Sequence, residues 1–462
     1  MIKANKLSRQ EKEAIGLLSI GTFLEYFDLM LYVHMAILLN ELFFPQADPL
    51  TAKLLGAAAF CSTFILRPVG GFFIGWIGDK IGRKSTIMIT TFLMAASCAT
   101  IAITGTYQEI GITASIIIIF CRMAQGFSSL GEVIGAALYL SEVMKFPKNH
   151  FSCGIIGLFS QIGGLFALIV SFFALSVNLN WRFAFFFGAG IALIGLMTRI
   201  RLKETPDFMA YKNKTNDNKY PNHKDKNTTD KIRDNQKVSI KNLLCCMMTI
   251  VIAPASLYVV YVYFNEIMKS IFNLNTEQII AHNIKVSIIS VVLTGIVAFS
   301  TKKLHPIKIT KITLAIFSIF LILTPYLINN YPNLFTITIL QVFFFFPVLT
   351  FSGILELSTW FRHFPVTKRF TVVATSYGIS TAFGYTIASF GLIYFSKSFG
   401  YYSLWIVFIP MLVCFYYSMR HLQNLEIKNG TYNNYPKEDN DLSTSEDIVE
   451  PEYKLNDDYE SI

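Results

Sequence analysis

The sequence lacks the residue patterns of an enzyme active site. It contains no HExxH, no GxSxG, no Walker loop and no cluster of His and Cys with the spacing of metal ligands. Its seven cysteines all lie in apolar segments, where a thiol behaves as a small buried hydrophobe. We therefore expect no enzymatic activity, no disulfide, no metal and no cofactor.

Charged residues are also scarce. They make up 15% of 462 residues, whereas hydrophobic residues make up 53% and phenylalanine occurs 42 times. The core of a soluble protein of this size carries far fewer hydrophobic residues, so this composition indicates a membrane protein. The formal charge of +9 is compatible with nucleic-acid binding, but the cations lie between apolar runs and not on one face. We expect a lipid bilayer as the partner and no nucleic acid.

Apolar runs of about 20 residues, enough to cross a bilayer, can be counted to twelve. Their approximate bounds are 14–39, 51–77, 85–105, 111–142, 151–177, 182–202, 242–272, 279–300, 309–329, 333–361, 368–397 and 400–421. The basic start leads into a run too long for a signal peptide, so no cleavable signal is expected. Most cations follow the even-numbered runs, which predicts that both termini are cytoplasmic.

The predicted fold class is an all-α polytopic membrane protein with twelve transmembrane helices in two bundles. One long polar insert, rich in Lys, Asn and Asp, separates six runs from the other six and cannot bury a core. The predicted domains are a six-helix bundle at 1–202, a cytoplasmic linker at 203–241, a second six-helix bundle at 242–421 and a disordered acidic cytoplasmic tail at 422–462.

Ionisable residues at membrane depth are the strongest functional signal, because each is costly unless it is paired or faces water. Glu25 and Asp28 are three residues apart, which puts both carboxylates on one helical face. The depth-compatible pairs are Glu25 or Asp28 with Arg122, and Arg67 with Glu132; Gln125 lies beside them. Making or breaking such a pair switches the protonation of the carboxylate and so couples proton binding to transport. The alternative is a static ion pair that holds the bundle together.

The second half offers fewer candidates. Glu356, deep in the tenth run, is a third candidate for binding a substrate ammonium or a proton if it faces the central cavity. Tyr258, Tyr261 and Tyr263 are interpreted as packing residues, with an aromatic cage for a quaternary ammonium as the alternative.

The stretch GWIGDKIGRK, residues 75–84, is predicted to form a tight polar turn between the second and third runs. Its spaced glycines let two helices approach closely, and Asp79 is expected to accept charge-assisted hydrogen bonds from the neighbouring cations. The pattern resembles the loop between helices two and three of the major facilitator superfamily. Its residues are Gly75, Asp79, Lys80, Gly82, Arg83 and Lys84.

Further stretches resemble the metabolite:proton symporter family of that superfamily. GTFLEYFDLMLY is similar to its span-one signature. LRPVGGFFIGWIGDKIGRK, RMAQGFSSLGEVIGAALYLSE, WRFAFFFG, RLKETPDF and FRHFPVTKRFTVVATSYGISTAFG are similar to its spans two, four and six and to its loop ten to eleven. The resemblance implies a proton-driven importer of small polar metabolites, and an inner charge relay of Asp79, Arg83 and Glu142. The loop after the eighth run, FSTKKLHPIKI, departs from the family because it lacks the repeated glycines and aspartate.

We therefore predict a proton-coupled symporter of a small polar metabolite or osmolyte, similar to proline or glycine betaine. It is expected to work by alternating access, as a monomer in a cell inner membrane, with its substrate and protons as partners. The alternatives are a symporter of an organic acid such as 2-oxoglutarate, citrate or shikimate, a sodium symporter or uniporter, a sugar carrier, and a sensor on the same fold that does not transport.

Overall fold

The computed structural model describes residues 7–44, 64, 66–176, 180–200, 202–206, 208–210, 212, 238–351, 355–433 and 435, and all regular structure in these residues is helical. The first half contains α1 (Arg9–Phe43), α3 (Arg67–Ile81), α4 (Arg83–Ile103), α5 (Tyr107–Ile110), α6 (Ile112–Leu130), η1 (Gly131–Gly135), α7 (Ala136–Val143), α8 (Lys148–Ser176) and α9 (Arg182–Arg199). The second half contains α12 (Ile240–Ile250), α13 (Ile252–Tyr258), η2 (Val259–Tyr263), α14 (Phe264–Phe272), α15 (Thr276–Ser300), α16 (Pro306–Asn330), α17 (Leu334–Phe344), α18 (Phe346–Phe351), α19 (Leu357–Trp360), η3 (Phe361–His363), α20 (Arg369–Phe399), η4 (Gly400–Tyr402) and α21 (Ser403–Lys428).

The helical fold class predicted from the apolar runs is confirmed. A bilayer offers no hydrogen-bond partner for the backbone, and a helix satisfies its own amides and carbonyls. Within the described residues, eight helical stretches are long and apolar enough to cross a membrane, and Arg182–Met197 and Leu334–Leu349 are shorter apolar helices. Described helix is present at each of the twelve predicted spans, although residues 51–63 of the second span lie outside the described part of the chain.

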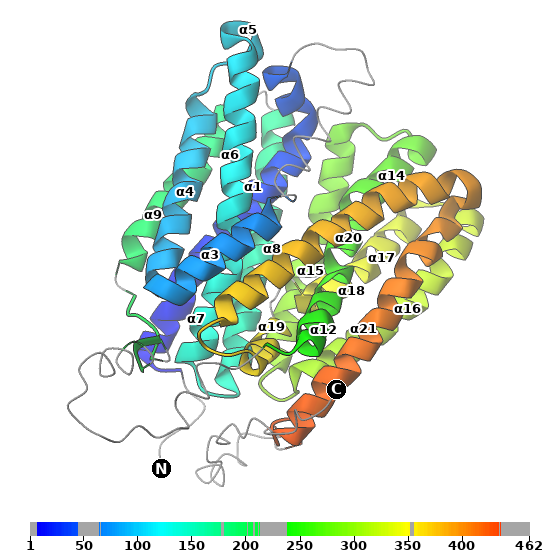
Figure 1. Cartoon of the computed structure of the whole chain (residues 1–462). Coiled ribbons are helices and arrows are strands. Elements are labelled where there is room, and N and C mark those ends of the chain that lie inside the picture. The colour runs from blue at the N-terminus through cyan, green and yellow to red at the C-terminus, as the bar shows by residue number, and fades with distance from the viewer. Residues whose placement is uncertain are drawn as a thin grey trace, which may run out of the picture.

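The helices form two groups, α1 to α9 and α12 to α21 (Figure 1). The groups meet along two helix pairs, α3 with α20 and α8 with α15. The beginning of α1 and the end of α21 lie at the same end of the molecule (Figure 1). We refer to this end, which is the one predicted to be cytoplasmic, as the inner end.

Small residues bring α3 and α20 into close contact. A Cβ added at Gly75 would lie 2.5 Å from the Cα of Thr371, and one added at Gly378 would lie 2.6 Å from the carbonyl oxygen of Arg67. Real Cβ atoms do not approach other atoms so closely, so larger residues would force the two bundles apart.

The boundaries differ from the predictions in two places. Residues 75–84 do not form a turn, because α3 continues to Ile81 and only Gly82, with φ of 108°, interrupts the helix before α4. The predicted disordered tail begins inside α21, where Leu422 and Glu426 are both fully buried. Residues 213–237 of the predicted linker and residues 436–462 of the predicted tail lie outside the described residues.

Candidate functional site

Glu25 on α1 forms a buried ion pair with Arg67 on α3. Arg67 Nη2 donates to Glu25 Oε1 at 2.9 Å, and only 3% and 5% of the two residues are exposed. The sequence predicted both residues as site candidates but assigned them the wrong partners. Arg67 pairs with Glu25 and not with Glu132.

Asp28, one turn further along α1, pairs with Arg122 on α6 as predicted. Arg122 Nη1 lies 3.2 Å from Asp28 Oδ2, and Gln125 Nε2 donates to Asp28 Oδ1 at 2.7 Å. The guanidinium also lies 4.0 Å from the centre of the Tyr32 ring, so a cation–π contact adds to the pair. Residues of two helices, α1 and α6, therefore surround this buried ion pair.

Both arginines have N–H groups that make no hydrogen bond to the described residues. Arg67 Nε, and Nε and Nη2 of Arg122, are buried without a hydrogen-bond partner among the described residues. A buried N–H without an acceptor is costly. The guanidinium fork is suited to a carboxylate, which accepts two parallel hydrogen bonds.

Arg67 faces a narrow cavity between the two bundles. Three tyrosines, Tyr26, Tyr377 and Tyr385, line it together with Thr381 and apolar side chains. An adjoining narrow cavity is lined by Tyr258, Tyr261, Tyr385, Phe64, Leu29, Met30, Leu257 and Val262. Among the described residues, Arg67 is the one charged side chain in either lining. Asp28 and Arg122 line neither, so they lie behind the cavity wall.

Glu132, on the π-helical turn η1, has a separate environment. It forms an ion pair of 2.6 Å with Arg199 of α9, and both side chains are fully buried. Thr90 and Thr91 of α4 donate to its other oxygen at 3.1 and 2.6 Å. All these partners belong to the first bundle, so we infer a structural role for this pair. The sequence analysis missed Arg199, because it lies at the end of a predicted span, where a cation usually faces water.

We expect Arg199→Met to lower the stability of the protein by roughly 3–5 kcal/mol, because it leaves the charge of Glu132 buried and unpaired. The double variant Glu132→Gln/Arg199→Met is expected to recover most of this loss. The measurement is the free energy of unfolding in detergent. Arg182→Met, whose pair with Glu109 spans 3.9 Å and is partly exposed, is the control and is expected to change it by less than about 1 kcal/mol. A double variant as unstable as Arg199→Met would contradict the static pair.

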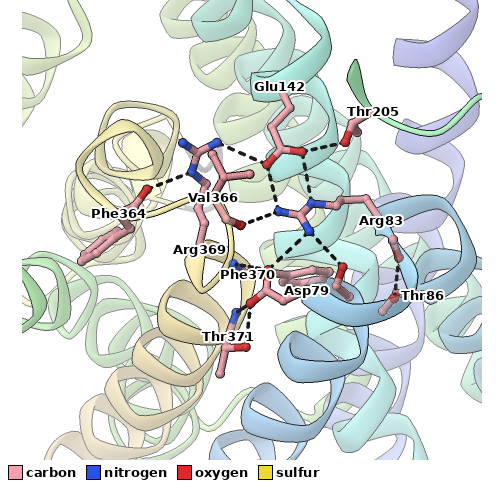
Figure 2. A network of polar contacts seen from close by, with 12 residues as sticks. Asp79, Arg83, Thr86, Glu142, Thr205, Phe364, Val366, Arg369, Phe370 and Thr371 are labelled. Carbon is pink, nitrogen blue, oxygen red and sulfur yellow. Dashed lines mark hydrogen bonds and ion pairs between the residues drawn. The ribbon is translucent and has the colours of Figure 1, made fainter. Parts of the chain in front are cut away.

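A second polar network closes the inner end between the bundles (Figure 2). Arg83, the first residue of α4, donates from Nε and Nη2 to the carboxylate of Glu142 at 3.1 Å each. Its Nη1 donates to the Gly78 carbonyl at 2.9 Å and lies 3.4 Å from Asp79. The three residues of the predicted charge relay, Asp79, Arg83 and Glu142, are therefore in contact.

The same network reaches the second bundle. Asp79 accepts from the Thr371 amide at 2.9 Å and from its hydroxyl at 2.7 Å, which caps the beginning of α20. Arg369 Nη1 donates to Glu142 at 3.2 Å. Arg83 Nη2 donates to the Val366 carbonyl at 3.0 Å. These bonds join the two bundles at the inner end.

The remaining residues of the 75–84 motif have other partners. Lys80 lies over the ring of Trp76 at 3.9 Å, and Lys84 donates to the Ile200 carbonyl at 2.9 Å, so neither pairs with Asp79. Glu204, which the sequence analysis did not single out, accepts from the amides of Arg83 and Lys84 at 2.9 and 3.3 Å. It thereby caps α4 from the segment after α9.

Glu356 does not line either cavity. It is 1% exposed and accepts a hydrogen bond from the Thr310 hydroxyl of α16 inside the second bundle. The condition for its predicted role, a position on the central cavity, is not met.

Comparisons with known proteins agree with this architecture. The sequence profile of the Major Facilitator Superfamily matches residues 18–361. The proline/betaine transporter of Escherichia coli (strain K12) is 32% identical over 267 residues, which cover 54% of this chain and 52% of that protein. The inner membrane metabolite transport protein YhjE of the same organism is 35% identical over 201 residues, or 41% and 45% of the two chains. The chain thus spans about half the length of the curated relatives that it matches.

Two solved structures share the fold. The proton:xylose symporter XylE, bound to 6-bromo-6-deoxy-D-glucose, superposes with a TM-score of 0.74 at 15% identity, over 90% of this chain and 95% of that one. The human organic anion transporter MFSD10 superposes with a TM-score of 0.64 at 13% identity, over 89% and 99%. At these identities the likeness is one of fold and not of substrate.

Proposed function

Because the chain belongs to the Major Facilitator Superfamily, we propose that it carries a small polar metabolite across a cell inner membrane as a proton symporter, by alternating access. It is a multi-pass membrane transporter and not an enzyme. The observation that carries the finer proposal is the Glu25–Arg67 pair, because Arg67 lines the cavity between the bundles and keeps Nε unbonded.

Coupling follows from competition for Arg67. A substrate carboxylate that enters the cavity binds the guanidinium, and the buried Glu25 loses its cation. A buried carboxylate in that position is stabilised by taking up a proton. Substrate and proton therefore bind together, and the pair re-forms when both leave. The Asp28–Arg122 pair, one turn away, is proposed to set the charge balance of the same site.

The cavity favours a compact zwitterion over a dicarboxylate or tricarboxylate. It presents one arginine, which suits one carboxylate, while Arg122 lies outside the lining. Tyr26, Tyr377 and Tyr385 offer ring faces to a substituted ammonium. Proline and glycine betaine fit this description, and the similarity to proline/betaine transporters supports the same class. We propose that both termini lie in the cytoplasm and that the protein acts as a monomer.

The test is uptake of radiolabelled proline, glycine betaine, 2-oxoglutarate and citrate into vesicles that contain the protein, with an imposed pH gradient and with the gradient collapsed. We expect accumulation of a zwitterion that disappears when the gradient is collapsed. Accumulation that persists with a sodium gradient alone would replace the proton by sodium. Accumulation of 2-oxoglutarate or citrate would overturn the one-carboxylate argument, and specific binding without uptake would indicate a sensor.

A further inference from the structure

The loop between α15 and α16 lacks the glycine and aspartate motif that connects α3 and α4 in the first bundle. Side chains of this loop nevertheless make contacts at the inner end. His305 caps the beginning of α16, as Arg83 begins α4. Its Nδ1 accepts from the Ile307 amide at 3.2 Å, so the ring proton resides on Nε2. Nε2 lies 3.7 Å from the carboxylate of Glu426, near the end of α21. Burial lowers the pKa of His305 below its ordinary value, so the ring is neutral near pH 7.

Glu426 organises the residues that follow α21. Glu426 is fully buried, and its carboxylate lies 2.8 Å from Nε2 of His363, which belongs to the segment before α20. Its backbone carbonyl accepts from the amides of Thr431 and Tyr432 at 3.1 and 3.3 Å, and its carboxylate accepts from the Thr431 hydroxyl. Gly430, with φ of 75°, allows the chain to reverse direction here. Residues 429–433 therefore turn back after α21.

Tyr435 is where this segment meets the first bundle. It is 6% exposed, its hydroxyl donates to the Thr301 carbonyl, and its ring lies 5.1 Å from that of His305. On the other side, its ring lies 5.3 Å from that of Phe146 and 6.2 Å from that of His150, which belong to the α7–α8 connection and the beginning of α8. One aromatic side chain thus packs between residues of both bundles.

Two further contacts cross the same interface. His150 Nδ1 lies 2.6 Å from the Ser358 hydroxyl of α19, and the Arg362 guanidinium lies 4.9 Å from the centre of the Phe146 ring. The beginning of α8 contributes to this cluster in the way that the beginning of α20 contributes to the network of Asp79 and Arg83. The two clusters lie at the inner ends of the two helix pairs that join the bundles, α8 with α15 and α3 with α20.

We propose that His305, Glu426 and Tyr435 form a second inner gate, in which residues 429–433 and Tyr435 replace the missing glycine and aspartate motif of the second bundle. This inference rests on the proposed alternating-access function. In the inward-closed state Tyr435 seals the α8–α15 side, while Asp79, Arg83 and Glu142 seal the α3–α20 side. Opening of the inner end requires Tyr435 to leave Phe146 and His150, so the segment contributes to the balance between inward-closed and inward-open states.

The test uses electron paramagnetic distance measurements across the inner end of the full-length protein in lipid nanodiscs. Nitroxide labels are attached at Lys12→Cys in the first bundle and Lys303→Cys in the second, both of which are exposed, after the seven native cysteines have been replaced by alanine. Tyr435→Ala is expected to raise the ratio of the long-distance to the short-distance population by about tenfold, since a buried aromatic contact is lost. Tyr435→Phe, which keeps the ring, and Tyr416→Ala, which removes an exposed ring from α21, are expected to match the parent.

A distance distribution in Tyr435→Ala that equals that of the parent, in a monodisperse protein, would overturn the second gate. If this variant does not fold, Phe146→Ala removes the same contact from the first bundle and decides the question in the same way. Glu142→Gln separates the two gates. A shift in Glu142→Gln alone would refute the second gate, and no shift in any variant would refute both gates. In either case the transport function is decided separately, by the uptake measurement in vesicles.

Discussion

Replacing Glu25 with glutamine is expected to turn an accumulating transporter into one that only equilibrates its substrate. Each pH unit of gradient is worth about 1.4 kcal/mol per proton, or about tenfold in accumulation. A gradient of about two units therefore supports on the order of 100-fold accumulation by a symporter that moves one proton per substrate. Glutamine cannot exchange a proton at this position, so the accumulation ratio should fall to about one.

Substrate exchange between the two sides should continue in Glu25→Gln, because Arg67 remains available to a carboxylate. The measurements are accumulation and counterflow in the same vesicles. Glu41→Gln removes an exposed carboxylate from the same helix and is expected to behave as the parent. The double variant Glu25→Gln/Arg67→Gln tests the static alternative. If it regains accumulation, the buried pair serves stability alone and the coupling proposal is wrong.

Replacing Glu142 with glutamine is expected to have the second-largest effect, because this carboxylate accepts hydrogen bonds from Arg83, from Arg369 and from the Thr205 hydroxyl. Glutamine would leave the guanidinium groups of the buried Arg83 and the partly buried Arg369 with one neutral acceptor. Each charge-assisted hydrogen bond contributes roughly 1.5–3 kcal/mol, so the inward-closed state should lose at least about tenfold in population. Uptake should slow by a similar factor, since the closed inner end is needed to admit substrate from the other side.

The measurement combines initial uptake rates with the inner-end distance distribution from the labels at Lys12→Cys and Lys303→Cys. Glu13→Gln is the matched control, because Glu13 is an exposed carboxylate at the same end of the molecule. Uptake that slows without any change in distance would mean that Glu142 acts elsewhere in the cycle. Normal uptake with an unchanged distance distribution would remove the gate altogether.

The sequence by itself determined the fold class and most of the charged residues that matter. Twelve apolar runs of about 20 residues predict helices, because a helix of this length crosses a bilayer and satisfies its backbone hydrogen bonds within one segment. Glu25, Asp28, Arg67 and Arg122 stood out because a charge at membrane depth is costly and therefore has a reason to be there. Depth along the helix axis predicted that Arg122 pairs with Glu25 or Asp28, and it pairs with Asp28.

Only the tertiary structure decided the remaining partners. Depth along the membrane leaves open which helices are neighbours and which faces they present, so Arg67 was assigned to Glu132 although it pairs with Glu25. Arg199 was missed for the same reason, since nothing local distinguishes a buried cation near a helix end from one that faces water. The residues from 422 onward were interpreted as a solvated tail from their composition. The partners of Glu426 and Tyr435 are His305, Phe146 and His150, which are distant in sequence. Local periodicity specifies helices, whereas ion pairs and gates depend on contacts between helices that no local pattern encodes.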